Sequence, residues 1–137
     1  MKNEHPLIKH WRRLANAHDR AAANVSHDRE VVASLRAHAH RRGVALRLPG
    51  LVPRDQIPEW LAAADLYVQP SRVLPSGRTE GLPMATLEAL AVGLPVIVSR
   101  SGGLAELDGG GGRVSFFAPN DVASLRASLL ESGIDGR

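Results

Sequence analysis

Short apolar segments rich in valine, leucine and isoleucine alternate with helical patterns along this chain of 137 residues. The segments that predict strands are Val44–Leu48, Leu66–Gln69, Val96–Ser99 and, more weakly, Arg113–Phe116. The segments that predict helices are Arg29–Arg42, Asp55–Ala64, Pro83–Val92 and Asp121–Leu130. Because strand and helix alternate with short connections, the pattern predicts an α/β fold: a partial doubly wound, Rossmann-like parallel sheet covered by helices.

The first 28 residues do not continue this alternation. They hold one amphipathic, basic helical pattern, Leu7–Arg20, and no convincing strand follows it. Since a complete doubly wound domain opens with a strand, we expect a basic helical lead over residues 1–28 and a partial α/β domain over residues 29–137. The helix Leu7–Arg20 either packs against this domain or lies on anionic lipid.

Charge is spread unevenly along the chain. Residues 1–47 hold ten Lys and Arg against four Asp and Glu, whereas residues 48–137 hold seven against ten. A basic half is compatible with an anionic partner, but a solvated helical surface is the simpler interpretation, and we expect no nucleic-acid partner. The chain has no cysteine, and its six histidines lack metal-ligand spacing, so we expect no bound metal.

The N-terminus has charged residues where a signal peptide needs an apolar core. Apolar runs elsewhere are interrupted by charged residues, glycine and proline, and fall short of the ~20 residues that a membrane span needs. These features predict a cytoplasmic protein, and the basic helix adds the inner face of the membrane as an alternative location.

Glycine and proline mark the loops that follow the first three predicted strands. These loops are Pro49–Pro53, Pro70–Gly81 and Arg100–Gly103. Ligands of open parallel sheets bind at the carboxyl ends of the strands, so we expect all three loops to converge on a binding edge.

The segment Thr79–Ser99, TEGLPMATLEALAVGLPVIVS, places two carboxylates in an otherwise apolar run. Pro83 suits the first position of a helix, because its missing N–H would be unpaired there, and Gly93 suits the helix end. The N-terminus of such a helix attracts phosphate through free N–H groups and the helix dipole. Gly81, just before it, lets a ligand approach the backbone closely.

Apolar residues surround Glu88 on all sides of this helix, which predicts a buried carboxylate in need of hydrogen-bond donors. A sugar diol supplies two such donors. Glu80, eight residues earlier, would face the same cleft. Alone, Glu88 would be interpreted as a helix acid that reaches solvent. Within this segment it predicts polyhydroxylated groups on either side of a phosphate, which is the shape of a nucleotide-sugar.

The segment PSGRTEGLPMATLEALAVGLPVIVSRSGGLAEL closely resembles the C-terminal donor-binding domain of retaining glycosyltransferases with the GT-B fold. The shared features are two glutamates separated by seven residues, the EALAVGLPVIVS that follows, and GGLAEL. Upstream, LRLPGLVPRDQIPEWLAAADLYVQPS matches in order and spacing. The resemblance covers residues 29–131 and implies that residues 29–137 form a partial nucleotide-sugar-binding domain of a glycosyltransferase.

The resemblance implies specific roles around the two glutamates. Glu88 takes the position that binds the ribose hydroxyls. The residues implied to hold the donor sugar are Glu80, Gly81 and Leu82.

Further roles follow from the same resemblance. The backbone amides of Met84 and Ala85 would approach the diphosphate. The residues implied to flank the base are Gly50, Leu51 and Val52. The family's phosphate-binding cations come from a first strand–helix unit that this sequence does not show, and no catalytic residue is carried over.

The implied reaction transfers a sugar from a nucleoside-diphosphate sugar to an acceptor hydroxyl with retention, in polysaccharide or glycoconjugate biosynthesis. No cofactor or metal is expected, and the implied partner is an N-terminal acceptor domain. Because that acceptor domain is missing, we expect no measurable transferase turnover from this chain alone. The alternative interpretation is a truncated, non-catalytic fragment or binding module.

Overall fold

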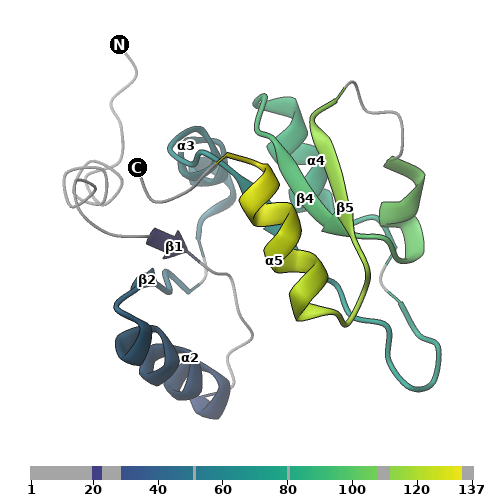
Figure 1. Cartoon of the computed structure of the whole chain (residues 1–137). Helices are drawn as coiled ribbons and strands as arrows, with labels where there is room; N and C mark the ends of the chain where they lie inside the picture. Colours follow the sequence, from purple (N-terminus) through teal and green to yellow (C-terminus); the bar gives the residue numbers. More distant parts are fainter. Residues whose placement is uncertain (1–19, 23–28, 51, 80, 108–111, 134–137) are drawn as a thin grey trace. The chain divides into compact units, whose positions relative to one another are not determined.

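The structure is a computed structural model that describes residues 20–22, 29–50, 52–79, 81–107 and 112–133 (Figure 1). The chain divides into two compact units, residues 1–59 with 136–137 and residues 60–135. The expected helix Leu7–Arg20 falls almost wholly outside the described residues. No helix in the described ranges is long and apolar enough to cross a membrane.

In the first unit, strand β1 (Arg20–Ala22) pairs in parallel with β2 (Ala45–Arg47), and helix α2 (Arg29–Arg42) connects them. The prediction that no strand precedes residue 29 is therefore wrong. The sequence Arg-Ala-Ala has no β-branched residue and no alternation, so its extended state depends on pairing with β2, which a local pattern does not reveal.

Helix α2 has the bounds that the sequence predicts. Its half-buried positions include Val32, Leu35 and Ala39, which confirms the predicted apolar face. The helix ends at Gly43, whose φ of 68° is easily reached without a Cβ. The next amide, of Val44, donates back to the Ala39 carbonyl at 3.0 Å, which closes a Schellman-type end.

The predicted helix over residues 55–64 is shorter in the structure. A 3₁₀ turn, η2 (Arg54–Gln56), leads directly into α3 (Ile57–Ala62). The Gln56 amide donates to the Pro53 carbonyl at 2.9 Å, so the tighter turn satisfies the start of the helix.

The second unit contains a parallel sheet of order β3–β4–β5. Its strands are β3 (Tyr67–Gln69), β4 (Val96–Ser99) and β5 (Val114–Phe117). Helix α4 (Met84–Ala91) contacts β3 and β4, whereas α5 (Val122–Glu131) contacts β4 and β5. Figure 1 shows α5 in front of the sheet and α4 behind it, so the unit has three layers. This architecture confirms the predicted α/β class with a parallel sheet.

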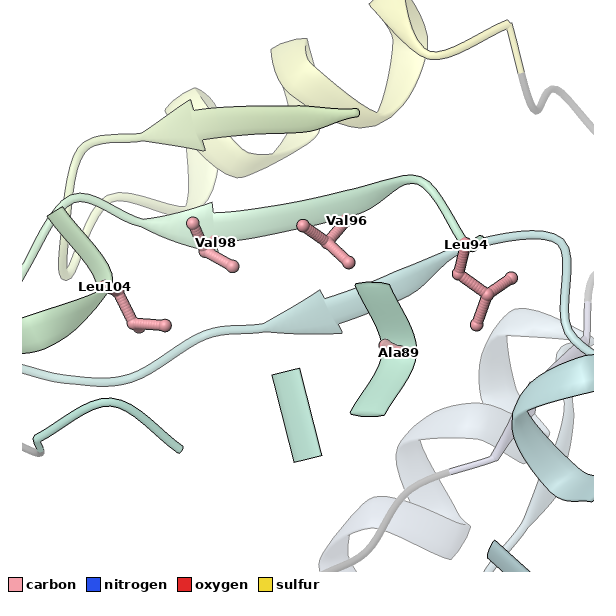
Figure 2. Close-up of a cluster of buried hydrophobic side chains, with 5 residues drawn as sticks. All are labelled: Ala89, Leu94, Val96, Val98 and Leu104. Carbon is pink, nitrogen blue, oxygen red and sulfur yellow. The ribbon is translucent and has the colours of Figure 1, made fainter. Parts of the chain in front are cut away.

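Strand β4 is buried along its whole length because it has a strand on each side and a helix layer on each face. Val96 and Val98 point toward Ala89 of α4, and together with Leu94 and Leu104 they form the core shown in Figure 2. Ile97 alternates to the opposite face and is also buried. A continuous apolar strand is typical of a parallel sheet covered on both faces.

Candidate functional site

The three strands of the second unit end at the same level, so their loops start from one edge. Gln69 pairs with Val98, and Ser99 pairs with Phe117. The following loops begin at Pro70, Arg100 and Ala118. A parallel sheet thus places these loops at its carboxyl edge, where ligands of such sheets bind.

Buried serine hydroxyls join two of these loops. The Ser99 hydroxyl donates to the Ser71 carbonyl at 2.7 Å and lies 3.0 Å from the Ser101 hydroxyl. All three residues are buried. Sequence analysis missed this cluster; its signal is a serine at the end of β4 and another two residues after each of β3 and β4, which pattern reasoning treats as ordinary loop composition. The cluster fixes the start of the β3–α4 loop to the end of β4.

The same two loops meet again where the β3–α4 loop ends. A Cβ built on Gly103 would lie 2.7 Å from the Leu82 amide nitrogen and 2.9 Å from the Gly81 carbonyl carbon. Gly103 belongs to a 3₁₀ turn, η3 (Gly102–Leu107), which the buried Leu104 anchors in the core. The predicted convergence is therefore confirmed for the loops after β3 and β4, and the backbone of Gly81 and Leu82 is in contact with Gly103.

Helix α4 begins beside this contact, one residue later than predicted. Pro83 is the N-cap, with φ −63° and ψ 130°, and Met84 is the first helical residue. The proline ring fixes φ at a value that suits either position, so ψ decides the boundary. Pro83 provides no side-chain cap, which leaves the amides of Met84 and Ala85 without the partner that capping side chains usually give. The helix ends as predicted at Gly93, where φ is 88°.

Only one face of α4 is buried, so the expectation of a helix that is buried on all of its faces is wrong. Thr86 and Ala89 are buried against the sheet, but Met84 is 61% exposed and Leu87 is 36% exposed. The second unit provides a sheet for one side of the helix, and no other described element of that unit covers Met84 and Leu87. Apolar residues on every face of a helix do not show whether one face or all faces are buried in the folded protein.

Glu88 lies on the open side of α4 and is half-buried. It follows Met84 by four residues, so the two side chains lie on one face, and helical side chains lean toward the N-terminus. The carboxylate therefore lies on the side of α4 that leads to the uncapped amides. Within the described residues no hydrogen bond or ion pair to this carboxylate is present.

The other predicted residues are placed as follows. Gly50 is exposed with φ of 70°, and Val52 is half-buried; both belong to the first unit. Glu80 and Leu51 lie outside the described residues. The cationic side chains of Arg72 and Arg78, in the loop after β3, are exposed. In the described ranges no cluster of three potential metal ligands occurs.

The comparisons with known proteins agree with the fold. Residues 1–132 match the family model of the glycosyl transferases group 1. The chain is 42% identical over 62 residues to the amylovoran biosynthesis glycosyltransferase AmsK of Erwinia amylovora, covering 45% of this chain and 15% of that protein. It is also 42% identical over 76 residues to a GDP-mannose-dependent phosphatidylinositol monomannoside mannosyltransferase of Mycobacterium tuberculosis, covering 53% and 20%.

Two solved structures share the fold at low identity. HepE of Anabaena, in complex with UDP-glucose, has a TM-score of 0.64 at 19% identity, with 94% of this chain and 44% of that chain covered. Sucrose-phosphate synthase of Thermosynechococcus elongatus has a TM-score of 0.64 at 18% identity, with 95% and 32% covered. The present chain thus spans less than half the length of each of these four proteins.

The fold is thus a doubly wound α/β unit of the GT-B type. Its loops lie at the carboxyl edge of a parallel sheet. The chain belongs to the glycosyl transferases group 1, a family of transferases.

Proposed function

We propose that this chain binds the nucleoside-diphosphate sugar of a group 1 glycosyltransferase. Glu88 accepts hydrogen bonds from the ribose hydroxyls, and the amides of Met84 and Ala85 bind the diphosphate. Glu80 and the backbone of Gly81 and Leu82 hold the donor sugar. Together with an acceptor domain, the complete protein transfers that sugar to an acceptor hydroxyl with retention, in polysaccharide biosynthesis.

One observation carries this proposal: an uncapped helix start and an unpaired carboxylate occur on the same short helix. The first amides of α4 have no cap from Pro83, and the half-buried Glu88 has no donor within the described residues. A nucleoside diphosphate supplies acceptors for the amides and donors for the carboxylate at once. A purely anionic ligand would satisfy only the amides, and an apolar ligand would satisfy neither group.

The names of relatives support the same chemistry. AmsK is named for amylovoran biosynthesis, and HepE was solved in complex with UDP-glucose. The mannosyltransferase of M. tuberculosis is named as dependent on GDP-mannose. Because these names differ in the nucleoside, they leave the base of the present donor to experiment. The base-flanking role of Gly50, Leu51 and Val52 stays a prediction.

Calorimetric titration of the purified chain tests the proposal. The probes are UDP, GDP and ADP, each alone and as its glucose or mannose conjugate, with either EDTA or magnesium present. We expect saturable binding of one nucleoside diphosphate and of its sugar conjugate, with equal affinity in EDTA and magnesium. Absence of binding by every probe at millimolar concentration would contradict the proposal and favour the non-catalytic module.

A further inference from the structure

The side chain of Asn120 holds both backbone polar groups of one residue in the β3–α4 loop. Its Oδ1 accepts a hydrogen bond from the Val73 amide at 3.1 Å. Its Nδ2 donates to the Val73 carbonyl at 2.8 Å. The two residues are 47 positions apart in the sequence. The amide side chain thus pairs with both backbone polar groups of Val73, as the backbone of a neighbouring strand would, because it offers one donor and one acceptor side by side.

The turn that carries Asn120 is itself held in place by the first turn of α5. The Asp121 carboxylate accepts from the Ser124 amide at 3.0 Å, which caps the helix. The Ser124 hydroxyl accepts from the Ala118 amide at 2.9 Å. Asn120 has a φ of 59°, a left-handed conformation in which asparagine is several-fold enriched over other non-glycine residues. The amide of Asn120 is therefore presented from a well-anchored position.

The segment that Asn120 contacts has little other support. Between Leu74 and Arg78 the loop closes on itself, with the Leu74 amide bonded to the Arg78 carbonyl at 3.0 Å and the Gly77 amide bonded to Leu74 at 2.8 Å. Residues 74–79 are all exposed. Val73 lies between this tight turn and Ser71, whose carbonyl the buried Ser99 hydroxyl binds. The clamp therefore acts where the loop leaves the body of the unit.

We propose that Asn120 is a positioning residue for the donor site. Its clamp on Val73 fixes the path of the β3–α4 loop, and thereby the approach of the Gly81 and Leu82 backbone to the donor sugar. The inference rests on the proposed function for its ligand, but the clamp itself is a property of the chain alone. It predicts that Asn120 influences sugar recognition without touching the sugar.

Two variants separate the clamp from the backbone conformation. Asn120→Gly removes both hydrogen bonds and keeps the left-handed backbone accessible, so it adds no strain. Asn120→Asp keeps the acceptor for the Val73 amide but places a carboxylate oxygen against the Val73 carbonyl. Arg126→Ala, an exposed change on α5, is the matched control.

The first measurement is amide hydrogen exchange in the absence of ligand. In Asn120→Gly we expect exchange at Val73, Leu74 and Gly77 to accelerate about tenfold, as expected when two hydrogen bonds are lost. Amides of β4 should keep the parent rate, which distinguishes local release from global unfolding. The Asp variant should lie between Gly and parent, and Arg126→Ala should match the parent. Unchanged loop exchange in the Gly variant would overturn the clamp.

The second measurement is the affinity for UDP-glucose and UDP, or for GDP-mannose and GDP if the parent prefers guanine. Asn120→Gly should weaken binding of the sugar conjugate several-fold and leave the affinity for the nucleoside diphosphate unchanged. Equal affinity of variant and parent for the sugar conjugate would overturn the positioning role even if loop exchange accelerates. If the parent binds no probe, the proposed function and the positioning role both fail, and exchange alone decides the clamp.

Discussion

Replacing Gly103 with alanine introduces a methyl group where two backbone segments touch. The new Cβ would lie 2.7 Å from the Leu82 nitrogen, 2.9 Å from the Gly81 carbonyl carbon and 3.2 Å from the Leu82 Cα. Ordinary van der Waals contact begins at 3.4 Å, so one segment must move by about 0.7 Å. All three atoms belong to backbone, and no side-chain rotation relieves the clash.

The cost follows from what each segment is attached to. Gly103 is followed by Leu104, which is fully buried in the core, whereas Gly81 and Leu82 are exposed. The exposed segment is therefore the one that moves. Overpacking of this kind costs about 1–3 kcal/mol in the free energy of unfolding. The Leu82 amide moves with its backbone, so a donor sugar that accepts a hydrogen bond there loses affinity as well.

Thermal or urea unfolding of Gly103→Ala measures the cost, with Gly81→Ala as the control. A Cβ on Gly81 meets nothing within 4 Å, and its φ lies outside the left-handed range. We expect Gly103→Ala to melt several degrees lower, ~4–8 °C for each kcal/mol in a unit of this size, and Gly81→Ala to melt like the parent. If both variants are as stable as the parent, the two loops do not touch at Gly103.

Three further predictions test the site and its surroundings. Glu88→Ala should weaken binding of a nucleoside diphosphate and of its sugar conjugate alike, and Glu80→Ala only binding of the conjugate, each by about 1–3 kcal/mol in calorimetry. An equal loss of affinity for the nucleoside diphosphate in both variants would refute the separate roles. Thr86→Val should raise the free energy of unfolding by about 1 kcal/mol, because the buried Thr86 hydroxyl has no hydrogen-bond partner in the described structure. Ser99→Ala should lower it by about the same amount, because the Ser99 hydroxyl donates to the Ser71 carbonyl. A Thr86→Val variant less stable than Ser99→Ala in urea unfolding would contradict this. The chain alone should show no sugar transfer in a radiolabel assay, because transfer needs donor and acceptor held in one geometry, and turnover by pure protein would disprove this.

The elements with strong periodicity were predictable from the sequence. Helix α2 and strand β4 have the predicted bounds, because a fourteen-residue amphipathic pattern and a continuous apolar run leave few alternatives. Strand β1 was missed, since Arg-Ala-Ala is extended only through its pairing with β2. Local pattern indicates which segments can be regular, but it does not reveal pairing between distant residues.

The candidate site divides in the same way. Gly93 ends α4 as expected, because the helix end needs a left-handed residue that the sequence displays directly. The open side of α4 was not foreseen, since an apolar helix in sequence carries no mark of which neighbours are present. Nor was the Asn120 clamp, because both of its hydrogen bonds depend on a fold that brings residues 73 and 120 together.

The contacts at the carboxyl edge connect the β3–α4 loop to three different neighbours. Ser99 ties the start of the β3–α4 loop to β4, Asn120 ties its middle to the β5–α5 turn, and Gly103 meets its end. Each of these contacts involves the backbone of the loop, and none of them involves the Leu82 side chain. Substitution of Leu82 should therefore cost little in the free energy of unfolding, whereas substitution of Ser99, Gly103 or Asn120 should disturb the path of the loop, and urea unfolding of the two groups of variants measures the difference.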